Sequence, residues 1–103
     1  MSEKFFDDMR TVVQNKTGFA IKFDDKYFGI RDYDSNDIWN IVSWDYYYVD
    51  NDFNSIQDGV LDGPDDDSDL PLEDAVRYLF DDLKIEPVSY EFIDTDWYFD
   101  KVM

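Results

Sequence analysis

Residues 19–31 have the sequence FAIKFDDKYFGIR, in which two short apolar segments are separated by polar residues. Apolar side chains occupy every second position of residues 19–23, and residues 27–31 are rich in the aromatic and β-branched types that strands favour. The intervening Asp24-Asp25-Lys26 has the composition of a tight turn. The segment therefore predicts an antiparallel β-hairpin.

The residues before this hairpin predict a helix over about residues 3–16. Apolar side chains repeat at helical spacing from Phe5 onward, and Ser2 is a suitable N-cap. Lys16, followed closely by Gly18, marks the expected end of the helix.

Two further segments follow the hairpin. Residues 38–44 predict a third strand, which can continue through residues 46–49 because aromatic and β-branched side chains dominate both. Residues 50–69 are polar and contain Asp58-Gly59, Asp62-Gly63-Pro64 and an aspartate run, so they predict an irregular stretch.

Residues 70–84 predict a second helix, with Pro in its first turn and an apolar stripe along one face, and Pro87 prevents its continuation. Residues 88–92 and 97–102 predict one or two closing strands. The order α-β-β-β-α-β indicates a single α+β domain over residues 1–103, with two helices packed on an antiparallel sheet of about four strands. Hydrophobic residues make up 44% of the chain and aromatic residues 19%, enough for one core.

Charge is distributed unevenly along the chain, whose formal net charge is -17. Residues 1–31, the predicted scaffold helix and hairpin, are nearly neutral at +1. Residues 32–76 carry -14 without a single Lys or Arg, and residues 77–103 add -4. We call residues 32–76 the acidic stretch. Its fourteen acidic residues are Asp32, Asp34, Asp37, Asp45, Asp50, Asp52, Asp58, Asp62, Asp65, Asp66, Asp67, Asp69, Glu73 and Asp74.

This segregation opposes folding, since two carboxylates about 7 Å apart repel by roughly 0.6 kcal/mol in water before screening. A solubilising surface is one explanation, and the preference of Asp for turns is another. The third explanation is an array of negative charges that binds a basic partner. Under this third explanation, the thirteen aspartates of the stretch are the candidate partner-binding residues.

An aromatic cluster lies inside the acidic stretch. Strand alternation would place Trp44, Tyr46 and Tyr48 on one face, and Asp45 and Tyr47 on the other. Core packing explains most of these rings. Tyr47, beside aspartates, is added to the candidate partner-binding residues because tyrosine is enriched at binding hot spots.

Catalytic chemistry is not expected. The chain has no cysteine and no histidine, which removes the usual zinc ligands, thiolate nucleophiles and the general base common near neutral pH. Calcium-loop patterns begin at Asp32 and Asp50, but both lack the Gly at the sixth position and the Glu at the twelfth. We therefore predict no enzyme activity, no cofactor and no dedicated metal site, leaving only weak divalent-cation binding by clustered aspartates.

The chain shows no secretion signal and no apolar run of membrane-spanning length, so we expect a soluble, cytoplasmic protein. A net charge of -17 also opposes binding to anionic membranes or directly to nucleic acid. The expected partner is basic.

In size, charge and aromatic content the whole chain resembles the small acidic DNA-mimic inhibitors of phages and mobile elements, such as anti-CRISPR and anti-restriction proteins. The resemblance implies that the surface formed by Asp32 to Asp74 occupies the basic cleft of a DNA- or RNA-handling protein, a nuclease above all. Two alternatives remain: an immunity protein that neutralises a nuclease toxin, and an acidic protein-interaction module unrelated to nucleic acid.

Overall fold

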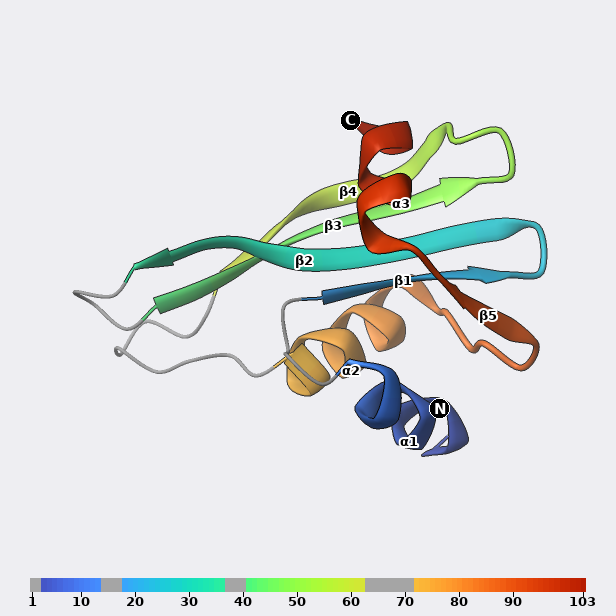
Figure 1. Ribbon diagram of the computed structural model, residues 1–103, viewed down its shortest axis with the longest axis horizontal. Helices are drawn as coiled ribbons and strands as arrows, with labels where there is room; N and C mark the ends of the chain where they lie inside the picture. Colours follow the sequence, from blue (N-terminus) through green and yellow to red (C-terminus); the bar gives the residue numbers. More distant parts are fainter. Residues whose placement is uncertain (1–2, 14–17, 37–40, 63–71) are drawn as a thin grey trace.

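An antiparallel β-sheet with helices on both faces forms the protein (Figure 1). The computed structural model describes residues 3–13, 18–36, 41–62 and 72–103. Within them the sheet has five strands in the order β4-β3-β2-β1-β5. The strands are β1 (Gly18–Phe23), β2 (Lys26–Asn36), β3 (Ile41–Asp50), β4 (Ser55–Asp62) and β5 (Tyr90–Ile93). The helices are α1 (Glu3–Val12), α2 (Leu72–Leu83) and α3 (Thr95–Val102).

The predicted hairpin is confirmed. β1 pairs with β2 in the register Phe19↔Ile30 to Phe23↔Lys26, and Asp24 in the turn adopts a left-handed φ of 51°. β2 continues to Asn36, so the acidic stretch begins inside a strand. Because β3, β4 and the start of α2 also belong to the stretch, the described part of its charge is carried mainly by strands and a helix.

The α+β class and the antiparallel sheet are confirmed, but two elements were predicted wrongly. Part of the stretch predicted to be irregular, residues 50–69, forms β4. Asp58-Gly59 suggested a turn, yet Gly59 pairs with Tyr46 of β3, and the Tyr46 hydroxyl would lie 3.3 Å from a Cβ at Gly59. The tyrosine ring covers the glycine and supplies cross-strand packing that the glycine cannot provide.

The second wrong prediction concerns residues 97–102, which form α3 and not a strand. Tyr98 and Phe99 are buried against the sheet, and Val102 packs beside them at helical spacing. An acidic residue in the first turn and Lys101 in the last turn suit the helix dipole. The aromatic content of the segment had favoured a strand, but its apolar periodicity is helical. α1 also ends earlier than expected, at Val12.

The helices divide between the two faces of the sheet (Figure 1). α1 and α2 cover one face, here called the two-helix face, and bury the main core around Phe5, Phe28 and Phe80. α3 crosses the opposite face, here called the α3 face, over a smaller cluster that includes Tyr27 and Val49.

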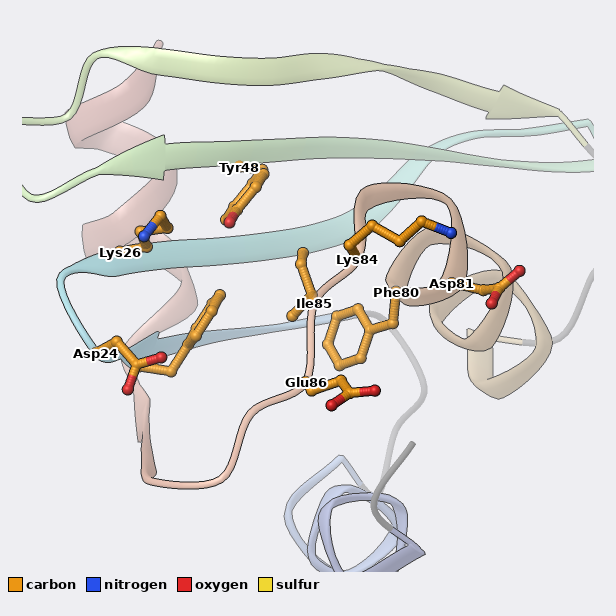
Figure 2. A pocket seen from close by; sticks show the side chains of 9 residues that line it. Asp24, Lys26, Tyr48, Phe80, Asp81, Lys84, Ile85 and Glu86 are labelled. Atoms are coloured by element: carbon orange, nitrogen blue, oxygen red, sulfur yellow. The ribbon is translucent and has the colours of Figure 1, made fainter.

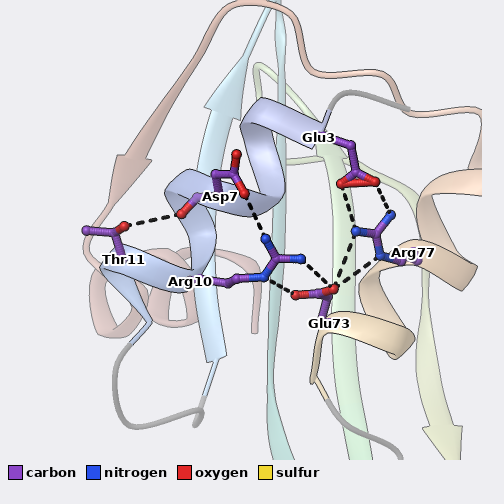
Figure 3. Close-up of polar contacts among 6 residues, drawn as sticks. All are labelled: Glu3, Asp7, Arg10, Thr11, Glu73 and Arg77. Carbon is purple, nitrogen blue, oxygen red and sulfur yellow. Dashed lines mark hydrogen bonds and ion pairs between the residues drawn. The ribbon is translucent and has the colours of Figure 1, made fainter.

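Ion pairs join α1 to α2 (Figure 3). The guanidinium of Arg10 donates two hydrogen bonds to Glu73, at 2.6 and 2.9 Å, and a third to Asp7 at 2.8 Å. Arg77 donates to Glu3 at 2.9 and 3.2 Å and contacts Glu73 at 3.4 Å. The Arg77 guanidinium also lies 3.9 Å from the centre of the Phe6 ring. Basic residues outside the acidic stretch thus hold the helix pair together.

Candidate partner-binding surface

The structure places the candidate residues in different environments. Exposed side chains belong to Asp32, Asp52, Asp58 and Asp74, whereas Asp50 and Tyr47 are half-buried and Asp45 is buried. For Asp34 in β2 and Asp62 in β4 only the backbone is described. Asp37, Asp65, Asp66, Asp67 and Asp69 lie outside the described residues.

Asp45 does not fit an exposed array of charges. Its residue exposure is 6%, and its carboxylate lies 3.6 Å from Arg31 Nε on the neighbouring strand. Burial raises the pKa of the Asp45 carboxyl, the Arg31 guanidinium opposes this effect, and the nearby Asp58 carboxylate adds to it. The inclusion of Asp45 among the surface contacts is therefore corrected, because strand alternation turns it toward the α3 face and onto Arg31.

Asp50 organises the turn between β3 and β4. Its carboxylate accepts hydrogen bonds from the backbone N–H groups of Asp52 and Asn54, both at 2.9 Å. The bond from Asn54 is the main reason that the pKa of Asp50 is lowered, so this carboxylate stays ionised.

Phe53 ties this acidic turn to α3. It has a left-handed φ of 66°, which is rare for an aromatic residue. Its ring stacks on Tyr27 at 4.8 Å and meets Trp97 edge-on at 5.8 Å between ring centres. This packing holds the exposed Asp52 at a fixed end of the sheet.

The predicted alternation along β3 is confirmed. Trp44 and Tyr46 are buried in the main core with Tyr48 packed against it, while Tyr47 belongs to the opposite face. Tyr47 packs edge-on against Phe99 at 6.0 Å, and its carbonyl oxygen accepts a hydrogen bond from the Tyr98 hydroxyl at 2.6 Å. Tyr47 therefore has a structural role in seating α3.

Three arginines from outside the acidic stretch neutralise part of it. Arg31 pairs with Asp45 and lies 4.3 Å from the Phe99 ring centre, while Arg10 and Arg77 both contact Glu73. Among the acidic residues of the stretch whose side chains the structure describes, Asp45 and Glu73 thus have cationic partners. Charge counting along the chain does not reveal these pairs. Only strand register and helix packing bring these groups together.

The remaining exposed carboxylates keep their charge unpaired within the described part of the chain. Asp32, Asp52 and Asp74 form no ion pair there, and the Asp58 carboxylate accepts a hydrogen bond from the neutral Ser55 hydroxyl. They do not share one face. Strand register places Asp32 on the two-helix face, opposite Trp44, and Asp58 on the α3 face, opposite Tyr47. Unpaired carboxylates consequently lie on both faces of the sheet.

The position of Asp74 is explained by the helix to which it belongs. It lies with Glu73 in the first turn of α2, where the helix dipole stabilises negative charge. Its presence in the acidic stretch is therefore weaker support for partner binding than that of Asp52 or Asp58.

A pocket of about 380 Å³ opens on the two-helix face beside the end of α2 (Figure 2). Phe23, Tyr48, Phe80 and Ile85 supply its apolar lining. Charges of both signs surround it, with Lys26 and Lys84 among Asp24, Asp81 and Glu86. This mixture of charges favours neither an anionic nor a cationic ligand. The three carboxylates are also exposed, whereas burial is what raises the pKa of a catalytic carboxylic acid.

Within the residues that the structure describes, no three acidic side chains come close enough together to hold a metal ion. None of the described helices has the length and apolar content needed to cross a membrane.

Comparison of the chain with known proteins gives no family: no family model, curated protein or solved structure matches it.

Proposed function

We propose that this chain is an acidic inhibitor that occupies the nucleic-acid-binding cleft of a partner protein, such as a CRISPR or restriction nuclease. One observation carries the proposal. All three arginines of the chain are engaged by carboxylates or aromatic rings, whereas Asp32, Asp52 and Asp58 stay exposed without a cation among the described residues. Because the guanidinium groups contact carboxylates and rings of the same chain, the exposed aspartates give the molecule a strong negative field.

The chemistry of such a partner follows from the field. Clefts that bind nucleic acid are lined with Lys and Arg, and duplex DNA presents one charge per roughly 1.7 Å of its axis. Carboxylates two residues apart on a strand are separated by about 6.6 Å, close to the spacing of successive phosphates on one strand. Asp32, Asp52 and Asp58 are not two residues apart on one strand, so what they share with phosphates is their exposed negative charge and not this spacing.

Steering by opposite charge is expected to make association fast and strongly dependent on salt. Binding should weaken steeply as the ionic strength rises, because the Debye length falls from about 30 Å at 0.01 M to about 8 Å at 0.15 M. A weak salt dependence would contradict an electrostatic mechanism.

A charge-reversal experiment tests which carboxylates matter. Asp32, Asp52 and Asp58 are changed together to Lys, which brings the net charge from -17 to -11. The matched control changes Asp81, Asp82 and Glu86 to Lys, which gives the same net charge. These residues lie at the end of α2 and just after it. We expect the first variant to lose at least about tenfold in affinity for the partner protein captured from a cell extract. The control should lose far less.

The comparison separates a local surface from net charge alone. Equal loss in both variants would show that only the total charge matters, and unchanged binding in the first variant would overturn the proposed surface. Displacement of the chain by nucleic acid would further distinguish a mimic from an acidic module that binds some other basic protein.

A further inference from the structure

Among the described strands, β4 lies at one edge of the sheet. It pairs with β3, and the sheet of described strands ends there. An open edge exposes backbone N–H and C=O groups that can pair with another extended segment. β4 spans eight residues, Ser55–Asp62, long enough to receive such a segment along its length.

The α3 face beside this edge combines apolar and acidic side chains. Val60 lies opposite Asp45 of β3, and Asp58 lies opposite Tyr47, so strand register places both on the α3 face. Val60 is 47% exposed and Asp58 is exposed as well. α3 contacts β1 and β2, leaving these β4 side chains accessible. Ile56, also 47% exposed, adds a second apolar side chain to β4.

Charge decides what can occupy the edge. If two copies paired antiparallel and symmetrically about Asp58, that residue would meet its own equivalent at a cross-strand distance of about 5 Å. Each copy also carries a net charge of -17. Self-pairing is therefore opposed locally and globally, while a segment with Arg or Lys opposite Asp58 is favoured.

We infer that the edge of β4 accepts an extended basic segment as a sixth strand, with cations opposite Asp58 and apolar side chains against Val60. The identity of the segment rests on the proposed function, since it belongs to a basic nucleic-acid-binding partner. Backbone pairing supplies affinity, and a cationic and an apolar side chain two residues apart, on one face of the added strand, supply selectivity.

Three synthetic peptides of about ten residues test this inference. The first repeats Arg-Thr-Val-Thr, so that Arg and Val lie two residues apart on one face of the strand, as Asp58 and Val60 do. The second has the same charge but Pro in place of one Val and one Thr, and the third has Glu in place of Arg. Pro lacks the N–H needed for a strand ladder, so the second peptide separates strand pairing from charge attraction. Binding is followed by titration, and amide hydrogen exchange is followed residue by residue.

We expect the Arg–Val peptide to bind most tightly and to slow exchange of amides in β4. Asp58→Lys should lower its affinity about tenfold, whereas Asp82→Lys, at an exposed position of α2, should change it by less than about twofold. Asp58→Asn serves as a second variant that removes the charge but preserves the shape. Unchanged exchange in β1 and β2 verifies that each variant is folded.

Equal binding of the Arg–Val and Pro-containing peptides, or unchanged exchange in β4, would overturn the inference. Salt-dependent binding of the whole protein to a nucleic-acid-binding partner, together with an unaltered β4, would refute strand addition and leave the proposed function standing. If the peptide adds a strand but the protein binds no nucleic-acid-binding partner, the edge site would stand and the proposed function would be refuted.

Discussion

At the residue scale, Gly29 shows how closely α3 approaches the sheet. A Cβ at this position would lie 2.3 Å from Cε2 of Tyr98, well inside the contact distance. Tyr98 is itself fully buried and donates its hydroxyl hydrogen bond to the Tyr47 carbonyl. The glycine is therefore required by the packing of α3 across β2.

Gly29→Ala is expected to destabilise the protein by about 3 kcal/mol, because either the Tyr98 ring or the strand must move. Gly59→Ala is the matched control, since its Cβ would lie 3.3 Å from the Tyr46 hydroxyl at the end of a side chain that can shift. Urea unfolding followed by far-ultraviolet circular dichroism measures both. Equal losses in the two variants would contradict the proposed packing.

Two tyrosines should make the protein sensitive to alkali. Burial raises the pKa of the Tyr98 phenol, and burial with the adjacent Asp8 carboxylate raises the pKa of Tyr90 to about 12. Because both values exceed the ordinary value of 10.0, the protonated phenols stabilise the fold fully below about pH 10. That stabilisation is lost as the pH rises toward and through the folded-state pKa values.

The urea midpoint is accordingly expected to fall above about pH 10, and to fall less steeply in Tyr98→Phe. The variant should also be less stable at neutral pH by about 1 to 2 kcal/mol, since the Tyr47 carbonyl loses its hydrogen-bond donor. The same alkaline slope in both proteins would exclude Tyr98 as a source of the pH dependence.

At the element scale, Glu73 lies between Arg10 of α1 and Arg77 of α2 (Figure 3). Hydrogen bonding from Arg10 is the main cause that lowers the pKa of Glu73 from its ordinary value of 4.5. The contribution of this carboxylate to stability is therefore complete above about pH 4.5 and is lost as the pH falls through the folded-state pKa.

Glu73→Gln is expected to destabilise the protein by about 0.5 to 1 kcal/mol at neutral pH, a modest effect because the ion pairs remain in contact with solvent. Asp74→Asn is the control in the same helical turn, and it forms no ion pair among the described residues. The difference between the variants should shrink below about pH 4 in urea titrations. A larger effect of Asp74→Asn would assign the stabilisation to the helix dipole.

Local patterns predicted some elements better than others. The β1–β2 hairpin and α2 follow from alternation and helical periodicity that their own residues carry. β4 does not, because Gly59 becomes a strand residue only when Tyr46 covers it. The aromatic run in α3 favours a strand, but Tyr98, Phe99 and Val102 pack against the sheet at helical spacing.

The candidate partner-binding residues also divide into features that the sequence predicts and features that depend on the fold. The sequence predicts which residues carry charge, and exposure of Asp52 and Asp58 agrees with their selection. The loss of Asp45 to Arg31 depends on the β2–β3 register, which charge counting does not contain. Pairing of Glu73 depends likewise on how α1 packs beside α2.

At the scale of the whole molecule, repulsion should limit stability. Acidic residues outnumber basic ones by 26 to 9, so raising the salt concentration screens more repulsion than attraction. The free energy of unfolding is expected to rise by roughly 1 kcal/mol or more between about 0.01 and 0.5 M NaCl. KCl should have the same effect, and a decrease in stability with either salt would show that attractive pairs dominate.

Displacement of a captured partner by nucleic acid tests the central claim most directly. The immobilised protein is exposed at low salt to an extract of the cells in which it occurs, and the bound protein is then challenged with DNA, RNA or polyglutamate at equal charge concentration. We predict release by DNA or RNA at a lower concentration than by polyglutamate, because the chain occupies a cleft built for phosphates. Retention of the partner at saturating DNA and RNA, or release by all three polyanions alike, would contradict the account.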